Sequence, residues 1–475
     1  MVRHIIITVC LWLAIFSLNG QTVWAGAIPQ AYKEQFAEAK LISLAAATCA
    51  GTYKEDGAAL EYRYLGDYGW KIRPFSVEKN GVTANFMVAT TAKKVEGRKL
   101  AVVAFRGSKT TGDWKVNFKV QQEPFNALPA NRKEKIEAQL DPQKIPSIHR
   151  GFNQYVNAAL SLNIDLDEDG KPDDVLSTLK KDANCQVLIC GHSLGGAAAT
   201  ILAERLVSLG VPKERIPVVT FGAPAVGNAA FAEEYGPKID LVRVVTSYDP
   251  VPASLQKVFG GYKQFGKLVE FPLAGTYTDF QHPISFYFDL AVKHYYDVLT
   301  KGEEAGYITP LPEEHRVGQV PLVAIAVTNM ENNPDQRYAP DIKRFVTDEY
   351  KTLFPSYIVL TTSLNKKAGQ SDKLRQLLNQ AAEAKAPYLV FLDIDRHSMG
   401  QTDKWYVTFS QAVFTVPEGN LVTMGTSGTR VTFNQGIMQS TIATMEQCRK
   451  DIEAKLPFVL NKEPMEWRFG TGGNK

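Results

Sequence analysis

Short apolar runs that alternate with helical patterns predict an α/β domain over residues 26–303. Four of these runs have the length of a strand: 100–107, 187–191, 216–224 and 241–249. Runs without polar alternation are typical of strands that are covered on both faces, as in a parallel sheet. Helical patterns lie between them, such as 197–209, which Gly210 ends. We therefore expect a mostly parallel sheet with helices on both faces.

The pattern changes after residue 303. Residues 304–318 contain prolines, glycines and charges without periodicity, which predicts a linker. Beyond it, residues 319–475 show a second and smaller set of signals. Strands are expected at 320–328, 356–362 and 388–394, a hairpin at 406–416 and 421–433, and helices near 340–352, 372–385 and 436–455. A chain of 475 residues is long enough for two such α/β domains.

The first 25 residues have the pattern of a secretory signal peptide. Arg3 is followed by an apolar stretch at 5–16, and small residues precede a cleavage site near Ala25. An uncleaved membrane anchor is the alternative, but the stretch is shorter than the roughly 20 residues that span a bilayer. We expect an exported protein, secreted or periplasmic.

Charge and cysteine content narrow the class of protein. The formal net charge is +3 without a concentrated basic run, which argues against a nucleic-acid partner. Cys49, Cys185, Cys190 and Cys448 would remain after cleavage. Cys185 and Cys190 flank one predicted strand, where an odd spacing places their side chains on opposite faces. Buried thiols are therefore expected, and nothing in the sequence fixes the oligomeric state.

The sequence GHSLGG at 191–196 places Ser193 at a tight turn between a strand and a helix. This context is the one that the G-x-S-x-G motif of serine hydrolases requires. Flanking glycines leave room for the neighbouring backbone at such a turn. We expect the Ser193 hydroxyl to project toward solvent, with the helix N-terminus beneath it. The amide of Leu194, the next residue, is expected to stabilise an oxyanion.

A serine nucleophile needs a base and a carboxylate that orients the base, and on this fold they follow the serine as Asp and then His. Asp249 stands at the carboxyl end of the run at 241–249, just past its apolar part, whereas Asp240 precedes that run and lies at the wrong end. Two histidines remain candidates for the base. His282 is in a loop before a helix that Pro283 can start, and His294 is inside that helix. Loops at a sheet edge usually carry catalytic bases, which favours His282.

Residues 60–300 resemble the class 3 lipases, the fungal-lipase-like branch of the α/β-hydrolases. Five motifs carry the resemblance in order: VVAFRGS at 102–108, DW at 113–114, IHRGF at 148–152, GHSLGGA at 191–197, and TFGAPAVGN at 220–228 leading to DPVP at 249–252. The resemblance implies a triad of Ser193, Asp249 and a histidine, and an oxyanion hole from Ser108 and Leu194. It also implies a lipid or other ester substrate, transient contact with a lipid surface, and a lid within 115–146.

An acidic segment at 163–174 departs from the family. Asp165, Asp167 and Asp169 stand at alternate positions before Gly170, as at the start of a calcium loop, with the Lys171 carbonyl and Asp173 as further ligands. Leu176 stands where an EF-hand has glutamate, so the loop would be a variant one. A structural calcium ion is thus one interpretation of the segment, and a solvated acidic turn is the other.

The sequence favours an exported carboxylic-ester hydrolase, a lipase or esterase that works through an acyl-enzyme and requires no cofactor for catalysis. The alternative is an exported binding or assembly protein whose residues 319–475 carry the function on a lipase-like scaffold. The complete set of Ser193, Asp249 and a candidate histidine argues for the enzyme.

Overall fold

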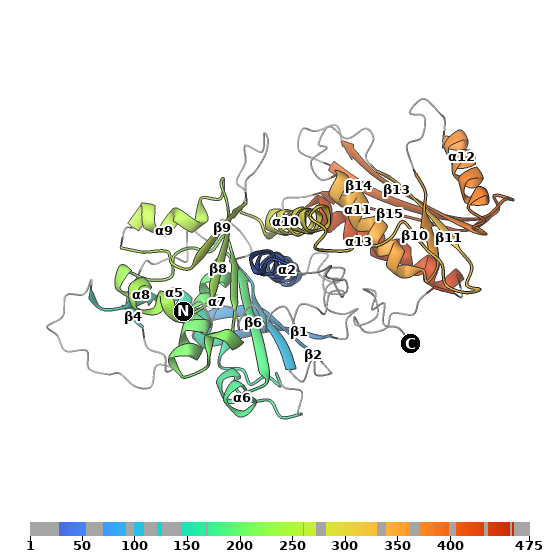
Figure 1. Ribbon diagram of the computed structural model, residues 1–475. Helices are drawn as coiled ribbons and strands as arrows, with labels where there is room; N and C mark the ends of the chain where they lie inside the picture. The colour runs from blue at the N-terminus through green and yellow to red at the C-terminus, as the bar shows by residue number, and fades with distance from the viewer. Residues whose placement is uncertain are drawn as a thin grey trace. The chain divides into compact units, whose positions relative to one another are not determined.

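The computed structural model divides the chain into two compact units (Figure 1). It describes residues 28–53, 70–91, 99–108, 121–125, 144–166, 170–259, 261–271, 282–329, 339–361, 370–398, 405–431, 436–456 and 458–459. Unit one contains the described residues within 37–291, and unit two contains 28–36 and those within 292–459. The expected signal peptide at 1–25 lies outside the described residues.

Unit one is built on a seven-stranded sheet in the order β1-β2-β3-β6-β7-β8-β9. Its strands are β1 (Trp70–Lys79), β2 (Val82–Thr91), β3 (Lys99–Phe105), β6 (Cys185–His192), β7 (Val218–Phe221), β8 (Leu241–Thr246) and β9 (Lys267–Phe271). β1 to β3 pair antiparallel, and β3, β6, β7, β8 and β9 pair parallel. The predicted α/β class with a mostly parallel sheet is confirmed.

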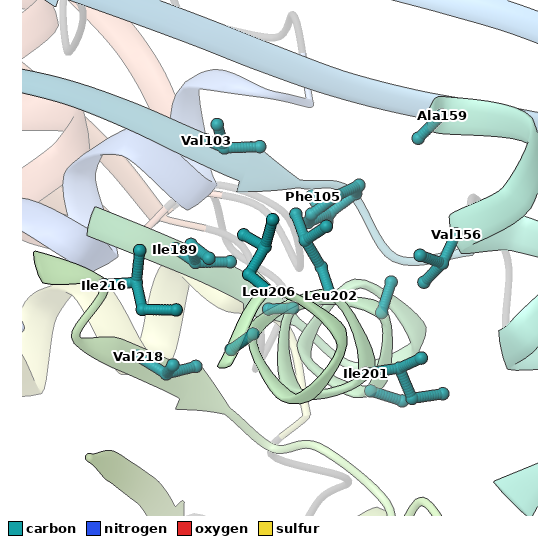
Figure 2. Packing of buried hydrophobic residues seen from close by; sticks show 14 of the residues in the cluster. Val103, Phe105, Val156, Ala159, Ile189, Ile201, Leu202, Leu206, Ile216 and Val218 are labelled. Atoms are coloured by element: carbon teal, nitrogen blue, oxygen red, sulfur yellow. The ribbon is translucent and has the colours of Figure 1, made fainter. Parts of the chain in front are cut away.

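Helices cover both faces of this sheet. The unit contains α5 (Arg150–Ala159), α6 (Val175–Lys181), α7 (Leu194–Ser208), α8 (Ala229–Tyr235) and α9 (Val251–Phe259), and parts of α2 (Gln30–Gly51) and α10 (Ile284–Glu304). The α7 helix packs along β6 and β7, and α5 packs along β2 (Figure 1). On the core side, Leu202 and Leu206 of α7 point toward Val103, Phe105 and Ile189 of the sheet (Figure 2).

The other face of the sheet carries α2. Successive side chains of a strand point to opposite faces, so Cys190 faces away from the cluster that contains Ile189. The Cys190 Sγ lies 3.3 Å from Thr48 Oγ1 of α2. The Ser43 hydroxyl of α2 donates to the Ala291 carbonyl of α10 at 3.0 Å. This packing brings the end of α2 next to the end of β6.

Two short strands lie outside the main sheet. β4 (Gln122–Pro124) pairs antiparallel with β5 (Ser147–His149). They fall within or beside 115–146, the segment in which the family resemblance implies a lid. Most of that segment lies outside the described residues.

Unit two has a six-stranded sheet in the order β10-β12-β11-β13-β14-β15. Its strands are β10 (Glu314–His315), β11 (Val323–Asn329), β12 (Tyr357–Val359), β13 (Tyr388–Ser398), β14 (Trp405–Thr415) and β15 (Leu421–Val431), and its helices α11 (Ala339–Leu353), α12 (Gln370–Glu383) and α13 (Ile437–Lys455). The segment 304–318, expected to be a linker, contributes β10 to this sheet.

The four cysteines of the described residues are buried thiols that form no disulfide, as the sequence predicts. Among the helices that the structure describes, none combines the length and the apolar character that a membrane span needs.

Candidate active site

The turn around Ser193 has the backbone geometry that the motif predicts. β6 ends at His192 and α7 begins at Leu194, which leaves Ser193 between them with φ 58° and ψ −126°. Only glycine adopts this backbone region without strain, so the turn holds Ser193 in a strained conformation. The Ser193 N–H donates to the Phe221 carbonyl of β7 at 2.9 Å, which ties the turn to the sheet.

The glycines of the motif are explained by close backbone approach. A Cβ at Gly191 would overlap the Gly195 carbonyl oxygen, and a Cβ at Gly195 would overlap the Phe105 carbonyl oxygen of β3. A Cβ at Gly196 would lie 2.6 Å from the Ala223 Cβ. The helix can therefore start directly against two strands only because these positions lack side chains.

Ser193 is less accessible than the sequence predicts. The residue exposes 3% of its surface, whereas a hydroxyl that projects into solvent was expected. One reason is the segment 106–108, which we call the oxyanion loop. A Cβ on Gly107 of this loop would lie 2.9 Å from the Ser193 Cβ and 2.8 Å from the His192 carbonyl oxygen. The loop thus packs directly on the serine.

Asp249 and His282 are joined by a hydrogen bond. His282 Nδ1 lies 2.8 Å from Asp249 Oδ2, and both residues are buried. An ionised carboxylate only accepts, so Nδ1 carries the hydrogen, and in the neutral ring Nε2 is then the basic nitrogen. Of the two candidate histidines, His282 is the one bonded to Asp249, while His294 lies in α10 within unit two.

Two further donors hold the Asp249 carboxylate. The Val251 N–H donates to Oδ1 at 2.8 Å, and the Tyr287 hydroxyl donates to Oδ2 at 2.5 Å. Burial, followed by the Asp249 charge, raises the pKa of Tyr287 well above its ordinary value, so this hydroxyl stays a donor. Gly222, with φ +55°, makes room for the group, because a Cβ there would lie 2.5 Å from Asp249 Oδ2. Three donors therefore fix the carboxylate.

His192 connects the serine turn to His282. Its Nε2 lies 2.7 Å from the His282 carbonyl oxygen, and the two imidazole rings are 4.7 Å apart. On its other side, Nδ1 lies 2.6 Å from the Tyr53 hydroxyl. His282 is thus bonded to Asp249 through its ring and to His192, the residue before Ser193, through its carbonyl oxygen.

Both expected oxyanion donors lie next to Ser193. Leu194 is the first residue of α7, and the first amides of a helix have no acceptor within the helix. Ser108 follows Gly107 in the oxyanion loop that packs on Ser193. The two amides thus belong to the residue that follows Ser193 and to the loop that packs on Ser193.

The acidic loop is described only in part. Asp167 and Asp169 lie outside the described residues, and Asp165, Lys171 and Asp173 lie within them. The Gly170 N–H donates to Asp165 Oδ2 at 3.1 Å. In the described part of the chain, no group of three acidic, histidine or cysteine side chains is arranged to hold a metal. Calcium stays a prediction, which the effect of calcium and of a chelator on thermal stability would test.

Tyr53 and Tyr287 are site residues that no sequence pattern indicated. Tyr287 stands five residues after His282 at the start of α10, and Tyr53 stands 139 residues before His192. Neither belongs to a motif, because a single tyrosine hydroxyl that meets a distant group has no sequence pattern. Only the tertiary fold brings them to the site.

Comparison with known proteins points to one family. Residues 102–259 match the family model described as Lipase (class 3). Phospholipase A1-II 3 of Oryza sativa subsp. indica is 28% identical over 211 residues, which cover 41% of this chain and 46% of that protein. Lipase ZK262.3 of Caenorhabditis elegans is 46% identical over 71 residues, 14% of this chain and 20% of that protein. The chain spans less than half the length of these relatives.

Among solved structures, lipase II from Rhizopus niveus aligns with 50% of this chain and 82% of its own, at 20% identity and a TM-score of 0.38. The family match contains Ser193, Asp249 and the oxyanion loop, and ends before His282. The resemblance to the class 3 lipases is confirmed by the family model over residues 102–259.

Proposed function

We propose that this protein hydrolyses carboxylic esters of lipids through a serine acyl-enzyme. The observation that carries the proposal is the Asp249–His282 hydrogen bond beside a serine in strained backbone geometry. The match to the class 3 lipase family supports a lipid ester as the substrate class. The names of two relatives, a phospholipase and a lipase, point to the same substrate class.

In the proposed mechanism the Ser193 Oγ attacks the acyl carbon of the ester. His282 Nε2 takes the hydroxyl proton, and Asp249 holds the ring and stabilises the imidazolium that forms. The amides of Leu194 and Ser108 stabilise the negative oxygen of the tetrahedral intermediate. The alcohol then leaves with the proton from His282, and a water molecule, deprotonated by the same nitrogen, releases the acid.

Access to the serine is part of this proposal. Ser193 exposes 3% of its surface, so we propose that residues other than the oxyanion loop move to admit the ester. Such a rearrangement fits the lid that the family resemblance implies. Export and contact with a lipid surface remain expectations from the sequence.

The test is covalent labelling of the purified protein with a fluorophosphonate, together with hydrolysis of a short-chain ester and of a phospholipid. We expect the label on Ser193, and we expect Ser193→Ala to lose labelling and at least about 10³-fold in kcat while it keeps its Tm. Ser161→Ala is the control, since the Ser161 hydroxyl only donates to the Ala158 carbonyl. Full activity of Ser193→Ala would exclude the proposal.

A further inference from the structure

We propose that Tyr53 and His192 are positioning residues that hold the oxyanion loop and His282 in register through one buried hydrogen-bond chain. The inference rests on the proposed function, because it assigns these residues a role in the same reaction. Neither residue reaches the reacting atoms in the proposed mechanism. Their effect is on the placement of groups that do.

The donor and acceptor of each bond in this hydrogen-bond chain follow from the group at its His282 end, which can only accept. The His282 carbonyl oxygen can only accept, so His192 Nε2 carries the hydrogen of that 2.7 Å bond. In a neutral ring, Nδ1 is then the acceptor, and the Tyr53 hydroxyl donates to it at 2.6 Å. The Gly107 N–H in turn donates to the Tyr53 oxygen at 3.0 Å. The chain therefore runs in one direction from the oxyanion loop to the backbone of His282.

Burial keeps every member of the chain in the required protonation state. His192 is buried, and burial, followed by the charge of His282, lowers its pKa well below the ordinary value. Burial is also the main cause that raises the pKa of the Tyr53 hydroxyl. His192 thus stays neutral and Tyr53 stays protonated across the pH range in which a serine hydrolase works.

The chain constrains the oxyanion loop at its centre. The Gly107 N–H already donates to Tyr53, so the adjacent Ser108 amide is the one left for the oxyanion. Arg106 strengthens the arrangement, because its guanidinium lies over the Tyr53 ring at 4.8 Å from the ring centroid. A donor that shifts by about 1 Å costs up to a hundredfold in rate. A large part of the stabilisation of the oxyanion in the transition state therefore depends on holding the loop at Gly107.

The same chain constrains His282 from its backbone. Asp249 holds the imidazole through Nδ1, and His192 holds the carbonyl group of the same residue. The bond to the carbonyl fixes the backbone from which the side chain extends, and the bond to Nδ1 fixes the ring, so both ends of the side chain are held. His192 precedes Ser193, so the turn that carries the nucleophile also positions the base.

The experiment measures kcat per active serine, with the active serines counted by fluorophosphonate titration. The variants are Tyr53→Phe, His192→Asn, His192→Phe and the two double variants that combine Tyr53→Phe with each His192 substitution. We expect Tyr53→Phe to lower kcat about tenfold to a hundredfold with KM little changed, because the oxyanion forms only in the transition state. Asn keeps an acceptor near the Nδ1 position, and Phe keeps none. The Tyr53→Phe effect should therefore persist in His192→Asn and shrink in His192→Phe.

Tyr350→Phe is the matched control. Tyr350 is a buried tyrosine of unit two whose hydroxyl donates to Gln411 Oε1 at 2.8 Å. This variant should lose stability without any change in kcat per active serine. A purely structural role of Tyr53 would give the same result, a lower Tm with unchanged kcat per active serine, and would overturn the inference. An equal loss of kcat on Tyr53→Phe in the wild type, in His192→Asn and in His192→Phe would overturn the inference as well. An unlabelled and inactive wild-type protein would instead overturn the proposed function and the inference together.

Discussion

Ser193 is the residue at which chemistry and stability compete. Its backbone angles, φ 58° and ψ −126°, lie in a region that costs about 1–3 kcal/mol for any residue with a Cβ. Glycine removes this strain, but its greater conformational entropy in the unfolded chain lowers the free energy of unfolding by about 0.5–1 kcal/mol. We therefore expect Ser193→Gly to be about 1 kcal/mol more stable than Ser193→Ala, measured as the free energy of unfolding in urea. Ser177 in helix α6 is the control position, where Gly should be less stable than Ala.

The residues of the site differ in how well the sequence predicts them. Ser193 and Asp249 each follow a predicted strand, so their place at the sheet edge can be inferred from the pattern. The sequence favoured His282 over His294 because His282 lies in a loop, but it left both open, since no local pattern shows which histidine meets Asp249. The bond to Asp249 singles out His282, since only the folded backbone brings residues 33 positions apart together.

At the scale of elements, the contact between the end of β3 and the start of α7 decides whether the turn can form. A Cβ at Gly195 would overlap the Phe105 carbonyl oxygen, which is backbone and cannot rotate away. We expect Gly195→Ala to lower the free energy of unfolding by about 3 kcal/mol. Gly210→Ala is the control, because φ there is +96° but nothing lies within 4 Å of a Cβ. Its cost should be about 1 kcal/mol, from backbone strain alone. Equal costs at the two positions would contradict the close-approach argument.

The apolar runs predicted the parallel strands well, because strands covered on both faces need continuous hydrophobicity. β3, β6, β7 and β8 fall on the four expected runs. The antiparallel strand β1 has no such run, since it is a partly exposed edge on which half-buried and exposed residues largely alternate. The burial of Ser193 was also beyond prediction, because it depends on a loop from another part of the chain.

Each of the two units has its own hydrophobic core. A buried ionisable group in one unit therefore affects the stability of that unit. Glu204 of α7 is fully buried, and neither carboxyl oxygen has a hydrogen-bond partner in the described part of the chain. Burial raises its pKa to about 8, partly opposed by Lys238. On the acid side, burial lowers the pKa of His149 to about 4. Unit one thus holds a carboxyl group that prefers its proton and an imidazole that resists one.

The raised pKa of Glu204 predicts that unit one becomes less stable as the pH rises. In the unfolded chain the carboxyl loses its proton near its ordinary pKa of 4.5, whereas in the fold it keeps the proton until about pH 8. Stability from this group is therefore present below the unfolded pKa and is lost as the pH rises toward 8, by at most about 1.4 kcal/mol per pH unit. Glutamine cannot ionise and has nearly the same shape, so Glu204→Gln should match the wild type near pH 4.5 and exceed its Tm by a growing margin toward pH 8. Glu233→Gln, at an exposed position paired with Lys263, serves as the control and should show no such divergence. Parallel Tm curves for Glu204→Gln and the wild type would mean that the Glu204 carboxyl is ionised in the folded protein and that a partner compensates its charge.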